Sequence, residues 1–423
     1  MAYALLAVIC VVIGTSVSSS VPNTTLLNVQ LLFRHGARTP TQPYPTDPHL
    51  NDTYMPYGLG HLTQLGREMA YMLGRYIRQR YVVGEDGSAP ASGFRLVEPE
   101  YRQGALLVNT SAVSRTQETA QAVLAGLFYP PGDSQQWRAA GSGLGQRWIP
   151  ISYNVLPVNT DRALIGSAPC SARDQEVMEL YNSTAYKRQL ERAVGNSSNL
   201  RYIQEHAGLS DADLTSQGLY FLYSDLRCQE DLNITLPSWA RQRGVYPDLL
   251  SVAADVVVES LSTSSDLRRL TWGDLTSGII YVAKNHGSQP RMCLYSGHDT
   301  TVESAIKSFG LETEDPAGNG LPEFTACLFF ELHKDSNGTL GMQFFYRREA
   351  GGPLVRMIPK GCGPFCRLDK MEALLVAKRE LPLPTDNCTV HPDLEGSLVN
   401  HHLHHVTTHG RRPYRRPRER KST

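Results

Sequence analysis

Two short stretches of the sequence combine histidine with charged side chains at the end of an apolar run. In LLFRHGARTP the run ends at Arg34, His35 and Arg38, and in RMCLYSGHDT it ends at His298 and Asp299. Two guanidinium groups beside one imidazole are costly without an anion, because like charges repel and desolvation adds to the cost. A phosphate removes that cost, since guanidinium groups donate charge-assisted hydrogen bonds to its oxygens. These residues predict a phosphate site.

The same residues predict a reaction at that phosphate. Nearby positive charge disfavours protonation of His35, and a neutral imidazole is a nucleophile. Attack on phosphorus would give a phosphohistidine and an alkoxide, for which Asp299 is the nearest acid. Water would then hydrolyse the intermediate. Uncatalysed hydrolysis of phosphate monoesters is so slow that enzymes gain up to ~10²¹-fold on it, and oriented positive charge is a natural way to supply much of that gain.

Three apolar runs of strand length would position these groups. Residues 26–33, 104–110 and 291–297 have the composition of strands buried on both faces. The Arg34–Arg38 motif follows the first run, and His298 and Asp299 follow the third. Arg115 lies just past the second run. Because ligands of open α/β sheets bind outside the carboxyl ends of the strands, we expect all these residues to converge.

Each of these residues also has a plainer interpretation. Arg34 and Arg38 could be surface arginines with salt-bridge partners, and Arg115 could sit at the start of its helix without further role. His35 or His298 could be structural histidines. Asp299 could serve only as a helix N-cap.

Helical periodicity is clearest in LTQLGREMAYMLGRYIRQRY, with Thr63 as the expected N-cap. The predicted buried stripe of this helix consists of Leu65, Met69, Met72, Leu73, Tyr76 and Ile77. Further helices are predicted at 117–127 and 301–309, and Asn337-Gly338 predicts a hairpin between two apolar runs.

The composition changes along the chain and suggests a division into a signal peptide, a catalytic core, an inserted domain and a tail. Residues 1–20 resemble a secretory signal peptide, with a retained membrane anchor as the alternative. We expect an α/β catalytic core over 21–155 and 249–390, and a helical insertion domain over 156–248. The basic and His-rich segment 391–423 is predicted to be a disordered tail, whose histidines could hold a metal and whose arginines could bind a polyanion. Lys plus Arg and Asp plus Glu both number 41, so the chain as a whole does not resemble a nucleic-acid binder.

Cysteines and sequons fit an oxidising compartment. Loss of Cys10 with the signal would leave seven cysteines, an odd number that implies disulfide pairs and one free thiol. Cys293, in an apolar run, is the expected free one. Sequons suit a glycoprotein and begin at Asn23, Asn51, Asn109, Asn182, Asn196, Asn233, Asn337 and Asn387.

RHGARTP together with YSGHDTT resembles the histidine acid phosphatases, and within them the animal prostatic and lysosomal branch. HLTQLGREMAYMLGRYIRQRY, SAVSRTQETA and GCGPFC extend the resemblance, which spans about 26–388. It implies a phosphoglycerate-mutase-like α/β core sheet flanked by helices, with a smaller, mainly helical inserted domain. It also implies a metal-free and cofactor-free enzyme, and in animal members often a homodimer.

The resemblance assigns roles to single residues. His35 would be the phosphorylated nucleophile and Asp299 the proton donor, and the phosphate would be held by Arg34, Arg38, Arg115 and His298. It also implies three disulfides, which are Cys170–Cys388, Cys228–Cys327 and Cys362–Cys366.

The sequence departs from this family at the pocket. Asn109 stands where relatives often carry arginine, and its sequon lies so close to the pocket that we expect no glycan there. LIGSAPC lacks an arginine that some relatives carry. The lysosomal branch carries a transmembrane segment near its C-terminus, where this sequence has the basic segment instead. We expect a secreted acid phosphatase of broad specificity, with a soluble lysosomal product second.

Three alternatives stay open. The first is a phosphatase specialised for inositol phosphates, lysophospholipids or phosphosugars. The second is a mutase of the wider superfamily. The third is a non-catalytic secreted protein that binds polyanions.

Overall fold

The computed structural model of the 423-residue chain describes residues 23–49, 54, 56–137, 143–214, 217–318, 320–383, 386 and 388. The expected signal peptide (1–20) and tail (391–423) lie outside these residues. None of the helices within them is long and apolar enough to cross a membrane.

The described residues contain one nine-stranded sheet. Its strands are β1 (Thr24–Arg34), β2 (Leu106–Ser111), β3 (Asn154–Leu156), β4 (Met292–Gly297), β5 (Leu311–Glu312), β6 (Cys327–Asp335), β7 (Leu340–Arg347), β8 (Val355–Pro359) and β9 (Cys366–Arg367). The spatial order is β3-β2-β4-β1-β6-β7-β8-β5, and β9 pairs with β7. The pairs β3–β2, β2–β4 and β4–β1 are parallel, and the pairs from β1–β6 onward are antiparallel.

The register brings the ends of the three predicted strands together, which confirms that expectation. Arg34 at the end of β1 pairs with Gly297 at the end of β4. Thr110, one residue before the end of β2, pairs with Ser296 on the other side of β4. The residues that follow all three strands therefore emerge at one edge of the sheet.

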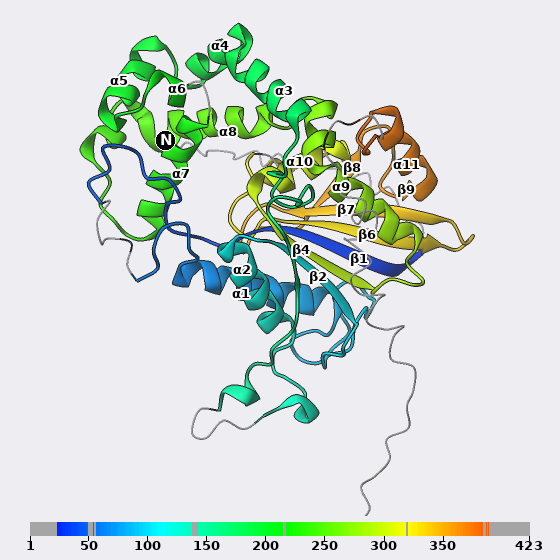
Figure 1. The fold of residues 1–423 in the computed structure, drawn as a ribbon. Coiled ribbons are helices and arrows are strands. Elements are labelled where there is room, and N and C mark those ends of the chain that lie inside the picture. Colours follow the sequence, from blue (N-terminus) through cyan, green and yellow to red (C-terminus); the bar gives the residue numbers. More distant parts are fainter. Residues whose placement is uncertain are drawn as a thin grey trace, which may run out of the picture.

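Helices cover both faces of the sheet and form a separate lobe beside it (Figure 1). They are α1 (Gln64–Tyr81), α2 (Ser114–Leu127), α3 (Ser171–Asn182), α4 (Thr184–Ala193), α5 (Ser197–Ala207), α6 (Asp211–Leu214), α7 (Gly218–Asp231), α8 (Leu250–Ser260), α9 (Ser265–Lys284), α10 (Asp299–Ser308) and α11 (Leu368–Ala377). α1 and α2 share a hydrophobic cluster with one face, and α9, α10 and α11 share another with the opposite face. The predicted α/β fold with flanking helices is confirmed.

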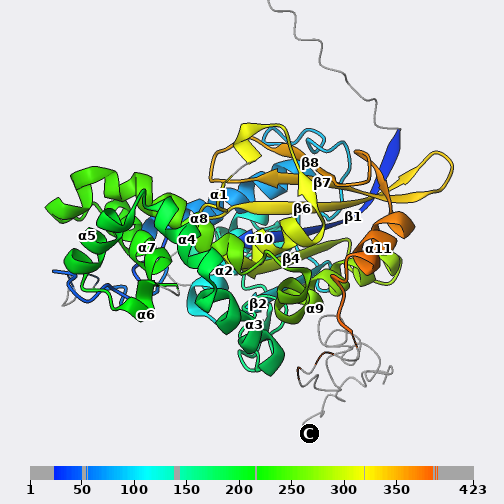
Figure 2. The same ribbon diagram turned by 90° about the horizontal axis from the view of Figure 1, so that it is seen from above.

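Helices α4 to α8 lie together in the helical lobe (Figure 2). They contribute to a hydrophobic cluster that belongs to this lobe. The cluster includes Leu250, Ala253 and Val257 of α8, beyond the boundary predicted at residue 248. Tyr44, which follows β1 in the sequence, is also part of this cluster. The lobe thus contacts the loop that follows β1 and begins at His35.

The buried face of α1 differs from the predicted stripe. Thr63 caps the helix as expected and accepts a bond from the Gly66 backbone N–H at 3.2 Å. However, Leu65 and Met72 are 39% and 59% exposed. The contact with α2 runs over Gly74, where an added Cβ would lie 2.0 Å from the Val123 carbonyl oxygen. Backbones this close leave no room for large side chains at the contact with α2. Leu73 and Ile77 of the predicted stripe are buried as expected.

The other local predictions agree with the structure. The helices expected at 117–127 and 301–309 are present as α2 and α10, although each begins two or three residues earlier. β6 and β7 form the predicted hairpin, and Gly338 in its turn has a φ of +83°. Glycine adopts this left-handed conformation without steric cost.

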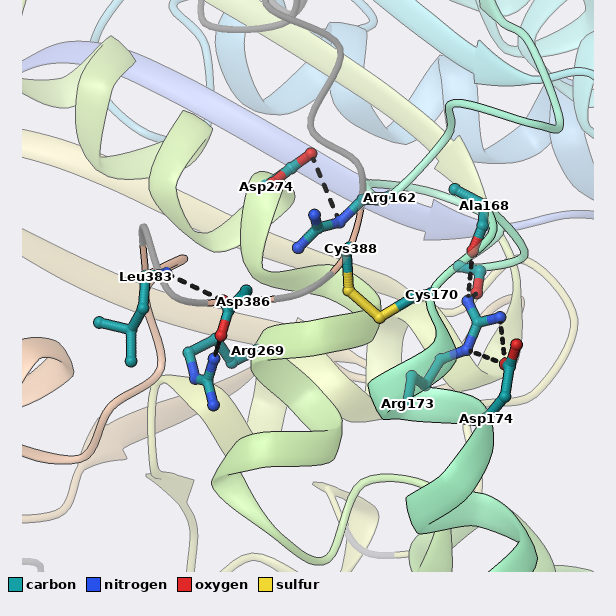
Figure 3. The surroundings of a disulfide bond; sticks show 11 residues. Arg162, Ala168, Cys170, Arg173, Asp174, Arg269, Asp274, Leu383, Asp386 and Cys388 are labelled. Carbon is teal, nitrogen blue, oxygen red and sulfur yellow. Dashed lines mark hydrogen bonds and ion pairs between the residues drawn. A yellow bond between two sulfur atoms is a disulfide. The ribbon is translucent and has the colours of Figure 1, made fainter.

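Two of the three expected disulfides are present. Cys170–Cys388 ties the chain beyond α11 to the start of α3, as Figure 3 shows, and Cys362–Cys366 closes a short loop. The expected Cys228–Cys327 bond is wrong, because both thiols are free and buried. Cys228 faces Arg38, with Sγ 3.5 Å from a guanidinium nitrogen, whereas Cys327 packs in the cluster beneath α1 and α2. Cys293 is free, as predicted.

Candidate active site

The loop after β1 is held in place on several sides. The His35 backbone N–H donates to the Gly297 carbonyl oxygen at 3.1 Å, and the Gly36 N–H donates to Thr119 Oγ1 at 3.1 Å. A Cβ added to Gly36 would lie 2.3 Å from the Gly66 carbonyl oxygen at the start of α1. The glycine therefore lets the loop pack directly on that helix, and the neighbouring imidazole is fixed before any substrate binds.

His35 is poised as a neutral imidazole. The residue is 2% exposed, and Nδ1 lies 2.9 Å from the Gly36 carbonyl oxygen. A carbonyl only accepts, so Nδ1 carries the proton and Nε2 keeps a free electron pair. Burial first, and then the charges of Arg115 and Arg34, hold the pKa of His35 well below its usual value. The lowered pKa thus favours the unprotonated ring.

Arg34 contacts Asp299 directly and lies near His35 through the ring of Phe324. Its guanidinium donates to the Pro322 carbonyl oxygen at 2.7 Å and pairs with Asp299 Oδ2 at 2.9 Å. It lies over the Phe324 ring at 4.3 Å, and this ring is in turn 5.8 Å from that of His35. These contacts fix the plane of the guanidinium at the edge of the site.

Arg38 and Arg115 carry the excess positive charge. Arg38 is 3% exposed and donates to Ser224 Oγ of α7 at 2.8 Å. Burial, and then the charge of Arg38, lower the pKa of Arg115 to about 10. Neither arginine forms a salt bridge with any residue that the structure describes. An anion with several oxygens would relieve this repulsion.

Asp299 sits at the first turn of α10 and accepts three interactions. Tyr220 of α7 donates its hydroxyl at 2.6 Å, the Thr300 N–H donates at 2.8 Å, and Arg34 forms the ion pair. Burial by itself raises the pKa of Asp299, but Arg34 and then the Tyr220 hydroxyl outweigh it and leave this pKa below its usual range. With these partners in place, the low pKa favours the ionised carboxylate.

His298 lies next to His35, with the two ring centroids 5.6 Å apart. Its Nε2 is 3.1 Å from Ser111 Oγ at the end of β2. Burial, and then the charge of Arg115, lower its pKa to about 3. The imidazole is neutral, so it adds hydrogen bonding to the site without adding to the positive charge.

The structure brings all six predicted site residues to one place. Sequence reasoning missed Tyr220, Ser224, Ser111 and Phe324. Ser111 ends β2 and could have been found by the strand-end argument. The two α7 residues have no motif around them, since only the packing of the helical lobe brings them to the sheet edge.

The expectation for the Asn109 sequon agrees with its surroundings. Asn109 is 1% exposed, and its side-chain oxygen accepts a bond from Asn154 Nδ2 at 3.1 Å. A glycan has no room there in the folded chain. By contrast, five other sequon asparagines are exposed, namely Asn23, Asn182, Asn196, Asn233 and Asn337. Within the described residues, no three His, Cys, Asp or Glu side chains form a group that could hold a metal ion.

Asp225 is a buried acid one residue from Ser224 on α7. It is 0% exposed, and neither of its carboxylate oxygens has a hydrogen-bond partner in the described structure. Burial raises its pKa to about 8, against the opposing pull of Arg38. Between about pH 4 and 8 the folded state therefore keeps a proton that the unfolded chain releases, so the free energy of unfolding falls as pH rises.

Asp225→Asn removes this titration and keeps the shape of the side chain. We expect the variant to be more stable than the unmodified chain at pH 8, by up to about 5 kcal/mol, and nearly equal to it at pH 4. Denaturant unfolding at both pH values measures this, with the exposed Asp248→Asn as control. A stability change of equal size at both pH values would contradict the assigned protonation.

Comparison with known proteins places this site in a family. Residues 25–159 match the histidine phosphatase superfamily (branch 2). Prostatic acid phosphatase of Mus musculus is 30% identical over 82% of this chain and 85% of its own length. Testicular acid phosphatase of Homo sapiens is 28% identical over 90% and 85%, and lysosomal acid phosphatase of Bos taurus is 29% identical over 81% and 76%. The chain belongs to the histidine phosphatase superfamily and is a phosphatase, as its motifs predict.

Solved structures support the same fold at lower identity. The phytase from Citrobacter braakii superposes with a TM-score of 0.58 at 19% identity, over 85% of this chain and 98% of that one. A Klebsiella phytase gives a TM-score of 0.58 at 16% identity, with the same coverage. These likenesses establish the shared architecture.

Proposed function

We propose that this chain hydrolyses phosphate monoesters in two steps through a phosphohistidine at His35. The observation that carries the proposal is the neutral, buried imidazole of His35 among three arginines. One of these arginines, Arg34, also forms an ion pair with the carboxylate of Asp299. Arg34, Arg38, Arg115 and His298 would hold the phosphoryl oxygens. A binding site alone needs neither a free Nε2 electron pair nor an adjacent carboxyl.

In the first step, His35 Nε2 attacks phosphorus and the P–O bond to the alcohol breaks. The leaving oxygen takes a proton from Asp299. In the second step, Asp299 accepts a proton from water as that water attacks the phosphohistidine, which releases phosphate and restores the imidazole. The guanidinium groups stabilise the charge on the equatorial oxygens in both steps.

The first step needs Asp299 protonated, although the ion pair with Arg34 and the Tyr220 hydroxyl favour its ionised form. A bound phosphoryl group competes for Arg34, and loss of that ion pair raises the pKa of the carboxyl. The monoanionic form of a phosphate monoester also brings a proton of its own, which it loses with a pKa of about 6. Substrate binding therefore supplies the conditions for general-acid catalysis.

We expect kcat/KM for p-nitrophenyl phosphate to be highest in acid and to fall above about pH 6, where the substrate becomes a dianion. The acid side should extend well below pH 6, because the pKa of His35 is lowered and the nucleophile stays unprotonated. A pH series of initial rates with the purified chain tests this. A maximum confined to alkaline pH would refute the assignment of roles.

We further propose that the enzyme acts outside the cytoplasm, as a secreted protein or, second, as a soluble lysosomal one. The disulfides Cys170–Cys388 and Cys362–Cys366 and the exposed sequons support an oxidising, glycosylating route. We also propose that the chain forms a homodimer, as the family resemblance implies.

A further inference from the structure

Asp225 is a buried carboxyl beside Arg38 that the proposed reaction does not use. Arg38 donates to two residues of α7, to Ser224 Oγ at 2.8 Å and to Cys228 Sγ at 3.5 Å. Asp225 directly follows the first of these and lies three positions before the second, and helix residues three positions apart are neighbours on the helix surface. The charge of Arg38 also acts on this carboxyl, against the effect of burial. Asp225 thus faces Arg38 from α7.

The loop after β1 encloses Asp225 on its other side. Gln229, one turn further along α7, donates to Asp47 Oδ1 at 3.1 Å and to the Tyr54 hydroxyl at 3.0 Å. The titratable side chains that face Asp225 are, from this loop, Arg38, Tyr44, Asp47 and Tyr54, and, from α7 itself, Cys228. Helix α8 also packs against α7, but none of its described residues puts a charge beside Asp225. Arg38 is therefore the one cation among the described groups around this carboxyl.

Arg38 and Asp225 both keep unpaired polar atoms. Arg38 Nε and both carboxylate oxygens of Asp225 lack hydrogen-bond partners in the described structure, and the two residues are 3% and 0% exposed. A buried carboxylate without a partner is costly, and a nearby guanidinium is the group that relieves this cost. A protonated carboxyl makes a much smaller demand. The charge of Asp225 therefore decides whether Arg38 has a competing partner inside the protein.

An ionised Asp225 opposes anion binding at the site in two ways. Its negative charge repels an anion held by the neighbouring arginine. It also competes for the guanidinium of Arg38, which already donates to α7. Both effects are absent while the carboxyl is protonated. Burial raises the pKa of Asp225 to about 8, so this change falls in mildly alkaline solution.

Building on the proposed function, we propose that Asp225 is a positioning residue for Arg38. While protonated, it leaves Arg38 to the phosphoryl group, and once ionised it draws the guanidinium toward α7. The site then loses affinity for phosphate-like anions in mild alkali through a side chain that never touches the substrate.

Binding of sulfate to the full chain, measured by isothermal titration calorimetry, tests this role. Sulfate keeps the same charge between pH 7 and 9, so a change in its affinity reflects the protein. Because apparent affinity scales with the fraction of protein in the binding-competent form, we expect Kd to rise by about 5- to 10-fold over this range. A rise below about 2-fold would overturn the inference.

The residues assigned to the anion keep their charge over this pH range. The pKa of His35 lies well below its usual value and that of His298 is about 3, so both rings stay neutral. The pKa of Asp299 is also below its usual range, and this carboxylate stays ionised. Arg115, with a pKa of about 10, remains largely charged. A rise in Kd between these pH values therefore reports on Asp225.

Asp225→Asn keeps the shape of the side chain and removes its titration. We expect this variant to bind sulfate at pH 7 as the unmodified chain does, and to keep that affinity within about 2-fold at pH 9. Asp248→Asn, at an exposed position, is the control and should show the full rise. A merely structural effect of Asp225 would change the affinity equally at both pH values. That result, or the full rise in Asp225→Asn, would contradict the proposed role.

Arg38→Ala shows whether the effect of Asp225 runs through Arg38. This variant should bind sulfate more weakly at both pH values, with Kd changing less than about 2-fold between them. The full rise in Arg38→Ala would show that Asp225 acts through another group and would overturn the inference. If Asp225→Asn does not fold, the pH series on the unmodified chain and on Arg38→Ala still decides.

The two proposals fail in different ways. Absence of hydrolysis for every ester would overturn the proposed function, whereas the sulfate titration needs no hydrolysis. Hydrolysis together with a sulfate affinity that does not change with pH would overturn only the role of Asp225.

Discussion

Replacing His35 with alanine is expected to lower kcat/KM by at least about 10⁴-fold for every phosphate monoester, because no other side chain in the site offers a free nucleophilic nitrogen at phosphorus. Steady-state rates with p-nitrophenyl phosphate and with an alkyl phosphate measure the loss. The fold should survive, since the His35 ring makes its one hydrogen bond within the described structure to the adjacent Gly36 carbonyl.

The control separates a lost nucleophile from a damaged site. His35→Ala keeps Arg34, Arg38 and Arg115, so it should still bind inorganic phosphate with nearly unchanged affinity. His286→Ala, at the end of α9, should leave activity unchanged. Activity retained within 10-fold in His35→Ala would remove His35 from the reaction.

Asp299→Asn should slow esters of poor leaving groups by about 10²–10⁴-fold, the usual contribution of a general acid, and esters of good leaving groups far less. Asparagine keeps one of the two oxygens, so it can still accept from the Thr300 N–H, but it has no acidic proton to give to an alkoxide. Rates with ethyl and p-nitrophenyl phosphate measure the difference. Equal slowing of the two esters would assign Asp299 a purely structural role.

Tyr220→Phe is the companion variant, because its hydroxyl helps to hold the pKa of Asp299 low. Loss of that bond raises this pKa, so the carboxyl stays protonated to higher pH. The alkaline limb of kcat should then move upward, whereas Asp299→Asn should abolish that limb for poor leaving groups. A merely structural effect of Tyr220 would lower the rate at all pH values without moving the limb.

The parts of the site that the sequence predicts are those that local chemistry determines. Residues 26–33, 104–110 and 291–297 are short, apolar and followed by polar groups, and parallel pairing brings such strand ends together whatever surrounds them. Arg34, His35 and Asp299 could therefore be placed with no knowledge of the rest of the fold.

The parts that were missed depend on contacts between distant segments. Tyr220 reaches Asp299 only because the helical lobe packs against the sheet edge, 79 residues away in sequence. Cys228 faces Arg38 for the same reason, so the disulfide expected with Cys327 does not form. Between α1 and α2, Gly74 and Gly126 allow a close helix contact that an apolar periodicity does not reveal.

The most direct test of the account is to trap the intermediate. Turnover of a ³²P-labelled monoester, stopped in alkaline detergent and mapped by peptide, should place a base-stable, acid-labile phosphoryl group on His35. The adduct should accumulate in Asp299→Asn with a good leaving group, because the base for its hydrolysis is gone, and it should be absent from His35→Ala. Label on another residue, or no adduct at any time point during rapid turnover in both unmodified chain and Asp299→Asn, would contradict a phosphohistidine mechanism.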